Sequence, residues 1–118
     1  MAQVLIVDDE PDLRRMLRLI CENAGYHVTE ATNGAAALER VALSQPDLIV
    51  TDLMMPVMNG NKLIQRLRQD PKTALIPVLE VTGNPDAAEG ADATLSKPLE
   101  PHRLLDTMAS LLKGEEET

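Results

Sequence analysis

The chain has 118 residues and a formal net charge of −8, and it contains no Trp, no Phe and one Tyr. This length fits one domain, whose core must be built from aliphatic side chains and Met. The acidic balance argues against non-specific binding to nucleic acid or to an anionic membrane surface, and it favours cations and basic partner surfaces.

The sequence carries no pattern typical of export. Residues 1–3 lead directly into an apolar run, so no signal peptide is predicted. No apolar stretch approaches the ~20 residues that cross a bilayer. The single cysteine, Cys21, cannot form an internal disulfide and fits a reducing compartment. We therefore expect a cytoplasmic protein.

Apolar runs typical of strands alternate with amphipathic stretches typical of helices. The run over residues 4–7 is continuously apolar, which is typical of a parallel strand covered on both faces. A helix follows, with Pro11 in its first turn and Gly25 as its stop. The remaining predicted elements are a strand over 26–31, a helix over 35–43, a strand over 47–51, a helix over 61–69, strands over 76–81 and 93–96, and a helix over 101–113.

This alternation predicts an α/β fold, a three-layer sandwich around a five-stranded parallel sheet. Right-handed crossovers place the carboxyl ends of all five strands at one edge of the sheet. Ionisable or hydroxyl side chains stand at the ends of four of those strands, so we expect these side chains to lie close together. They are Asp8, Asp9, Asp52, Thr82 and Lys97.

Three carboxylates at one edge repel one another and need positive charge nearby. Lys97 supplies one charge, and a hard divalent cation such as Mg²⁺ takes carboxylate oxygens as ligands. An ionised aspartate beside Mg²⁺ can attack phosphorus and form an aspartyl phosphate. Phosphoryl transfer needs donors and positive charge on the phosphoryl oxygens, and Mg²⁺, Lys97 and the Thr82 hydroxyl suit that task.

These motifs resemble a response-regulator receiver domain, the CheY-like phosphoacceptor of two-component signalling. The resemblance covers residues 3 to about 112, and the segment around Asp52 is its most diagnostic part. It implies a flavodoxin-like sheet with strand order 2-1-3-4-5. The matching motifs are Val7-Asp8-Asp9, Asp52-Leu53-Met54-Met55-Pro56-Val57-Met58-Asn59-Gly60, Val81-Thr82, Gly90-Ala91-Asp92 and Lys97-Pro98.

The resemblance implies a phosphoryl acceptor and a metal site. Asp52 accepts the phosphoryl group from a histidine kinase or a phosphotransfer protein. Asp9, Asp52 and the backbone carbonyl of Met54 ligate Mg²⁺ directly, and Asp8 does so through water.

The resemblance also assigns roles to two residues on later strands. Lys97 contacts the phosphoryl oxygens, and the Lys97–Pro98 bond is cis. Thr82 is the switch hydroxyl that moves toward the aspartyl phosphate, although a strand-end hydroxyl without a switching role is the alternative. The switch then alters a partner-binding surface.

The chain departs from the family between its fourth and fifth predicted strands. Only residues 83–92 separate Thr82 from the last strand, near the lower limit for a parallel crossover, where the family usually has a helix of about three turns. We expect at most about one helical turn near residues 85–89, or none. Thr94 stands where many family members have a switch Tyr or Phe, so the output surface is expected to differ.

Glu80 interrupts the apolar fourth strand. Because burying an unpaired carboxylate is costly, two interpretations are open. Either the short crossover leaves Glu80 partly exposed to water, or a base such as Lys72 or Arg68 pairs with it. Neither interpretation allows a sealed and unpaired Glu80.

Several other side chains have a structural explanation. Met55 and Met58 are expected to pack in the loop after Asp52, and Cys21 is expected to be a core thiol. His27 and His102 are expected at the surface rather than as phosphate carriers.

Three further functions are alternatives to the phosphoacceptor. A pseudo-receiver would bind partners without phosphorylation. A Mg²⁺-dependent phosphatase with an aspartate nucleophile usually has a second acid two residues later, where this chain has Met54. A flavodoxin-like cofactor binder needs a Ser/Thr/Gly-rich phosphate loop, and Asp8-Asp9-Glu10 would repel phosphate without a metal.

The expected protein is a signalling module and not an enzyme with a separate substrate, since it catalyses only its own phosphorylation and dephosphorylation. Residues 1–113 form the receiver domain, and residues 114–118 form an acidic tail. The chain is either a stand-alone regulator or part of a larger protein. Its partners are a kinase or phosphotransfer protein and an unidentified downstream protein, with no nucleic acid and no membrane, and we expect a monomer or weak dimer.

Overall fold

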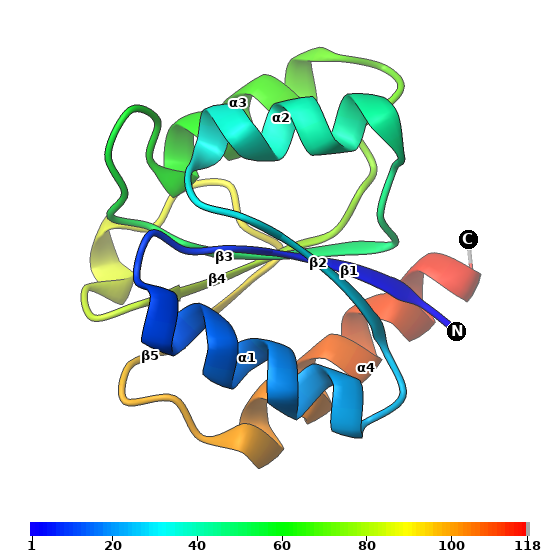
Figure 1. Cartoon of the computed structure of the whole chain (residues 1–118). Coiled ribbons are helices and arrows are strands. Elements are labelled where there is room, and N and C mark those ends of the chain that lie inside the picture. The colour runs from blue at the N-terminus through cyan, green and yellow to red at the C-terminus, as the bar shows by residue number, and fades with distance from the viewer. Residues whose placement is uncertain (118) are drawn as a thin grey trace.

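Five parallel strands form one sheet with helices on both of its faces (Figure 1). The structure is a computed structural model that describes residues 1–117 and the side chains of residues 1–114. The strand order is β2-β1-β3-β4-β5, which confirms the flavodoxin-like order. The strands are β1 (Gln3–Val7), β2 (His27–Ala31), β3 (Leu48–Asp52), β4 (Val78–Thr82) and β5 (Ala93–Ser96).

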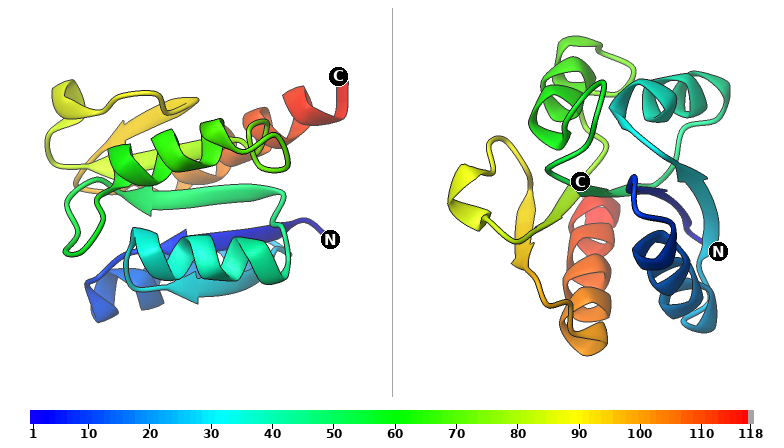
Figure 2. Two further views of the ribbon diagram at one scale, coloured as in Figure 1. Left: turned by 90° about the horizontal axis from the view of Figure 1, so that it is seen from above. Right: turned by 60° about the vertical axis from the view of Figure 1, so that its left-hand side comes forward.

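The helices divide between the two faces, which confirms the three-layer sandwich. Helices α2 (Gly34–Leu43) and α3 (Gly60–Gln69) cover one face, and α1 (Pro11–Asn23) and α4 (Pro101–Glu117) cover the other (Figures 1 and 2). Both faces of the central strands are therefore covered, as the continuous apolar runs predicted.

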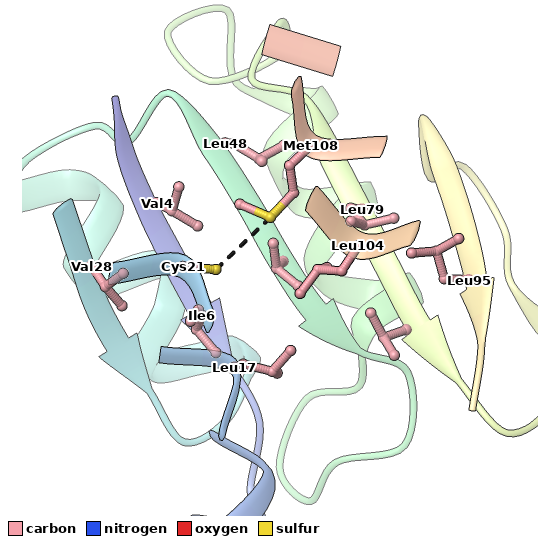
Figure 3. Close-up of a cluster of buried hydrophobic side chains, with 12 residues drawn as sticks. Val4, Ile6, Leu17, Cys21, Val28, Leu48, Leu79, Leu95, Leu104 and Met108 are labelled. Atoms are coloured by element: carbon pink, nitrogen blue, oxygen red, sulfur yellow. Dashed lines mark hydrogen bonds between the residues drawn. The ribbon is translucent and has the colours of Figure 1, made fainter. Parts of the chain in front are cut away.

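The core beneath α1 and α4 is built from aliphatic side chains and two sulfur atoms (Figure 3). Cys21 on α1 and Met108 on α4 are fully buried, and their sulfur atoms lie 3.8 Å apart. Burial raises the pKa of the Cys21 thiol to about 11. Cys21 is therefore an unreactive core residue, as predicted.

The second core lies between the sheet and helices α2 and α3. Successive side chains on a strand point to opposite faces, so Leu5, Ile49 and Val78 point to this side. Met55 and Met58 pack against the same cluster, which confirms that they are packing residues of the loop.

The short crossover between β4 and β5 contains one 3-10 turn, η1 (Pro85–Ala87), in place of an α-helix. The prediction of at most about one turn is therefore confirmed. Gly90 has a φ of +83°, and a Cβ at this position would lie 3.2 Å from Cγ2 of Ile64. The glycine thus lets the crossover turn sharply where it passes close to α3.

Two element ends differ from the prediction in a way that affects the site. Strands β3 and β4 end at Asp52 and Thr82, so both side chains belong to the last strand position and not to the loops. Helix α4 continues beyond the predicted end at Lys113 to Glu117, so the predicted tail begins as helix. Thr118, the last residue of that tail, lies outside the described residues. No helix within residues 1–117 has the length and apolar character needed to span a bilayer.

The structure contradicts both interpretations of Glu80. The side chain is 0% exposed, and neither carboxyl oxygen has a hydrogen-bond partner among the residues that the structure describes. Arg68 instead donates to the carbonyls of Ala74 and Ile76 and to Asp92. Both interpretations assumed an ionised carboxylate, but burial, together with the Asp52 charge, raises the pKa of Glu80 to about 7. A neutral carboxyl is far less costly to bury than a carboxylate.

Candidate functional site

The predicted site residues meet at the edge where the strands end, on the left of Figure 1. Asp8 and Asp9 follow β1, while Asp52 and Thr82 end β3 and β4. Lys97 directly follows β5, and its N–H donates to the Thr82 carbonyl at 3.0 Å. The parallel arrangement therefore brings together side chains from four strands that are far apart in sequence.

Asp8, Asp9 and Asp52 form an acidic cluster. One carboxylate oxygen from each lies within 4.8 Å of the others. Asp8 and Asp52 are buried, whereas Asp9 is exposed. Oxygen donors at this spacing on one open side suit a hard divalent cation that keeps part of its water shell, and Mg²⁺ is such an ion. The donor set therefore fits the metal that the sequence predicted.

The surroundings of Asp8 disfavour the charged form of its carboxyl group. Burial is the main cause, and the neighbouring Asp52 adds to it, so the pKa of Asp8 rises to about 6. The backbone N–H of Glu10 donates to Oδ1 of Asp8 at 2.8 Å and works in the opposite direction. Burial and the nearby Asp52 charge thus outweigh the hydrogen bond from Glu10 at the Asp8 carboxyl group.

Asp52 has one cationic neighbour. Nζ of Lys97 lies 3.4 Å from Oδ1 of Asp52, and the Leu53 N–H donates to the same oxygen at 2.8 Å. The Asp52 side chain is only 9% exposed, whereas that of Lys97 is 30% exposed. Lys97 can therefore reach solvent and a group bound at Asp52 at the same time. The Lys97–Pro98 bond is cis, as the resemblance implied.

The Thr82 hydroxyl is buried and holds the start of the short crossover. It accepts a hydrogen bond from the Asn84 N–H at 3.0 Å. Thr94, where many family members have an aromatic ring, is exposed on β5. Any movement of Thr82 is therefore linked to the backbone at Asn84 and not to a rotating ring.

The loop after Asp52 has features that the sequence analysis missed. The Gly60 N–H donates to the Leu53 carbonyl at 2.8 Å, and a Cβ at Gly60 would lie 2.4 Å from the Asp52 carbonyl oxygen. Only glycine allows α3 to start this close to the acceptor strand. Val57 adopts a φ of +67°, while the Met58 N–H donates to the Pro56 carbonyl, so a strained γ-turn closes the loop.

Met54 is 70% exposed at the rim beside Asp52. His27 and His102 are exposed and belong to other parts of the surface, as predicted.

Arg14, to which no sequence motif pointed, also contacts the site. Its guanidinium donates to the Asp8 carbonyl and to Glu30 on β2, each at 2.8 Å. A cation in the first turn of a helix opposes the helix dipole, and the contacts with Glu30 and the Asp8 carbonyl compensate Arg14 for this placement.

The fold and the edge together define a class: flavodoxin-like α/β proteins with an acidic cluster at the carboxyl ends of their strands. Within that class, the family model of the response regulator receiver domain matches residues 4–109. The chain belongs to the response regulator receiver domain family, and it is a receiver domain of two-component signalling.

Individual relatives agree with this assignment. Protein PilH of Pseudomonas aeruginosa is 33% identical over 121 residues, and the match covers 97% of this chain and 100% of PilH. The response regulator receiver protein CpdR of Brucella abortus is 37% identical, with coverage of 95% and 98%. Among solved structures, the receiver domain of a signal transduction histidine kinase from Syntrophus aciditrophicus has a TM-score of 0.92 at 31% identity, covering 100% of this chain and 95% of that one.

Other relatives are longer than this chain. It spans 12% of the sensor histidine kinase TmoS of Ectopseudomonas mendocina and 50% of the transcriptional regulator RpaA of Synechocystis. Receiver domains of this sequence type therefore occur both alone and as parts of larger proteins.

Proposed function

We propose that this receiver accepts a phosphoryl group on Asp52 in the presence of Mg²⁺ and thereby switches a partner-binding surface. The observation that carries the proposal is the position of the Asp52 carboxylate, which is flanked by two acidic side chains within 4.8 Å and by Lys97 at 3.4 Å. A nucleophilic carboxylate, a cation site and a lysine are the parts that phosphoryl transfer to an aspartate needs.

Asp8, Asp9, Asp52 and the backbone carbonyl of Met54 hold the metal in this proposal. Bound Mg²⁺ supplies positive charge for the phosphoryl oxygens. Asp52 and Lys97 carry the transfer itself. An Asp52 oxygen forms a bond to phosphorus while the bond from phosphorus to the donor's imidazole nitrogen breaks, and the electron pair of that bond stays on the nitrogen. Lys97 stabilises the charge on the transferred group.

The phosphoryl donor is a histidine kinase or a histidine phosphotransfer protein. Among the relatives, one is named a sensor histidine kinase and another a response regulator receiver protein. Thr82 carries the response, because a shift of its hydroxyl toward a phosphoryl group removes the acceptor of the Asn84 N–H. The surface at the short crossover then changes, and the shape and charge of this surface determine which downstream protein binds.

Phosphorylation by a small donor tests this function. The chain is incubated with acetyl phosphate or phosphoramidate and MgCl2, and intact mass is measured. We expect a gain of one phosphoryl group that does not occur when a metal chelator is present from the start, nor in Asp52→Asn. Asp106→Asn, which removes an exposed carboxylate on α4, serves as the matched control and should behave as the native chain. A folded native chain that gains no phosphoryl group would instead be a phosphorylation-independent interaction module, and a gain that persists in Asp52→Asn would place the modification elsewhere.

A further inference from the structure

Arg14 on α1 connects the loop after β1, which contains Asp8 and Asp9, to strand β2. Its Nη1 donates to the backbone carbonyl of Asp8 and its Nε donates to Oε1 of Glu30, both at 2.8 Å. The Arg14 side chain is only 18% exposed, and Glu30 lies on β2 next to β1. A planar guanidinium that donates to two separate acceptors fixes the direction in which each acceptor lies, and it also supplies positive charge.

The contact with the Asp8 carbonyl determines the orientation of Asp8 and Asp9. That carbonyl belongs to the same rigid peptide plane as the N–H of Asp9, so holding the oxygen sets the direction in which the chain enters Asp9. The Asp8 N–H donates to the Ala31 carbonyl at 3.1 Å, and the Glu10 N–H donates to the Asp8 carboxylate at 2.8 Å. Arg14 completes this set by restraining the carbonyl.

Glu30 keeps Arg14 in place. Arg18 also donates to Glu30, so one carboxylate joins two guanidinium groups on consecutive turns of α1. Burial alone would raise the pKa of Glu30, but the hydrogen bonds from Arg18 and Arg14 outweigh burial and hold the pKa below its ordinary value. The Glu30 carboxylate therefore neutralises the charge of Arg14. Arg14 acts on Asp8 and Asp9 by fixing the position of the backbone and not as a free positive charge.

We propose that Arg14 is a positioning residue for the Mg²⁺ site, which holds the Asp8–Asp9 peptide in its metal-ready orientation while Glu30 holds Arg14. The inference rests on the proposed function, since it concerns the metal site of that function. Arg14 touches neither the cation nor the phosphoryl group. Its removal should therefore weaken Mg²⁺ binding without removing the chemistry.

Arg18 provides a matched control. It shares Glu30 with Arg14, lies on the same helix and pairs with Glu22, but its contacts do not include Asp8. Arg14→Gln and Arg18→Gln each remove one cation and one contact with Glu30. Only the first variant releases the Asp8 carbonyl.

Mg²⁺ affinity is measured by isothermal titration calorimetry with MgCl2 on the full chain. We expect Arg14→Gln to bind Mg²⁺ about tenfold more weakly, because residues that orient metal ligands typically contribute 10–100-fold to affinity. Arg18→Gln should stay within about twofold of the native chain, and Arg14→Lys, which can keep one of the two contacts, should lie between them. Thermal melts without Mg²⁺ identify any variant that does not fold at the assay temperature; Arg14→Lys then replaces Arg14→Gln.

Phosphorylation by acetyl phosphate over a range of MgCl2 concentrations separates positioning from chemistry. In Arg14→Gln the half-saturating Mg²⁺ concentration should rise about tenfold, while the rate at saturating Mg²⁺ stays within about twofold of the native rate. Glu30→Gln should shift the Mg²⁺ dependence in the same direction. The double variant Arg14→Gln/Glu30→Gln should be no worse than Arg14→Gln, because Glu30 acts through Arg14.

Three outcomes overturn the inference while the proposed function stands. They are unchanged Mg²⁺ affinity in folded Arg14→Gln, an equal loss of affinity in Arg18→Gln, and a rate in Arg14→Gln that saturating Mg²⁺ does not restore. A native chain that binds no Mg²⁺ contradicts the proposed function and this inference together.

Discussion

The carboxyl group of Glu80 is sealed in the middle of the sheet, two residues before the switch hydroxyl of Thr82. Its neighbours in register are Thr51 on β3 and Thr94 on β5. Within the described part of the chain neither of its oxygens has a hydrogen-bond partner, and burial raises its pKa to about 7. The group is therefore mainly neutral in mildly acidic solution, and its ionisation above pH 7 opposes the folded state.

The raised pKa predicts that Glu80 lowers stability as pH increases. Between the unfolded pKa of 4.5 and the folded pKa of about 7, the folded state holds the proton and the unfolded state releases it. The free energy of unfolding therefore falls over this range, by about 2 kcal/mol between pH 5.5 and 8, and the loss is complete above the folded pKa. Glu80→Gln should abolish this part of the pH dependence.

Urea unfolding of the native chain and Glu80→Gln at several pH values measures the difference. Comparing the two removes the contributions of other groups, including Asp8, that both chains share. Glu80→Met, which conserves volume and removes the polar group, should be more stable than the native chain at every pH and most of all at pH 8. Parallel pH profiles for the native chain and Glu80→Gln would show that Glu80 does not titrate in this way.

At the scale of elements, two side chains of α3 hold the crossover between β4 and β5: Arg68 pairs with Asp92 at its end, and Asn61 binds its middle. Nδ2 of Asn61 donates to the Ala87 carbonyl at 2.8 Å, and the Glu89 N–H donates to Oδ1 of Asn61 at 2.9 Å. Most of the residues from 83 to 92 are exposed. The crossover therefore has few buried contacts, and the two Asn61 hydrogen bonds contribute a large share of what holds its middle in place.

Asn61→Ala should loosen this segment without unfolding the domain. Each hydrogen bond contributes about 1 kcal/mol, which corresponds to a roughly fivefold change in a local opening equilibrium. Hydrogen–deuterium exchange should therefore accelerate at least about fivefold at the Glu89 amide, while exchange in β1 and β3 stays unchanged.

Two variants distinguish the Asn61 clamp, which is the pair of hydrogen bonds from Asn61 to the crossover, from a general effect on α3. Asn61→Asp keeps the acceptor for the Glu89 N–H but loses the donor to Ala87, so its exchange rate should lie between those of the native chain and Asn61→Ala. Gln65→Ala changes an exposed residue one turn further along α3 and should leave the segment unaffected. Equal acceleration in Gln65→Ala would mean that α3, and not the Asn61 clamp, controls the crossover.

At the scale of the whole molecule, the sequence determines the fold and the composition of the edge but not the finer contacts. Continuous apolar runs, separated by helical stretches, predict the parallel sheet, and parallel strands bring Asp52 to Asp8 and Lys97. The state of Glu80 depends on how completely its surroundings exclude water, and no local pattern specifies that. The contact from Arg14 to Asp8 depends on side-chain direction between two elements, which alternation of apolar residues does not encode.

The acidic character of the chain links the site to the stability of the molecule. The net charge is −8, and three carboxylates lie within 4.8 Å at one edge, so the metal-free fold is opposed by repulsion there. An ion that binds only the folded state stabilises it by RT ln(1 + [L]/Kd), about 1.4 kcal/mol at ten times the Kd. MgCl2 should therefore raise the melting temperature by about 5 °C beyond NaCl of equal ionic strength.

Asp9→Asn distinguishes a metal site from general screening because its two effects have opposite signs. Asp9 is the exposed member of the cluster, so removing its charge relieves repulsion with little loss of other contacts. The metal-free variant should melt at or above the native temperature, yet gain less from MgCl2 than the native chain does. Asp106→Asn removes the same charge on α4 and should keep the full Mg²⁺ increment. If Asp9→Asn also kept it, Mg²⁺ would be acting on the overall charge of the molecule and not at the edge of the sheet.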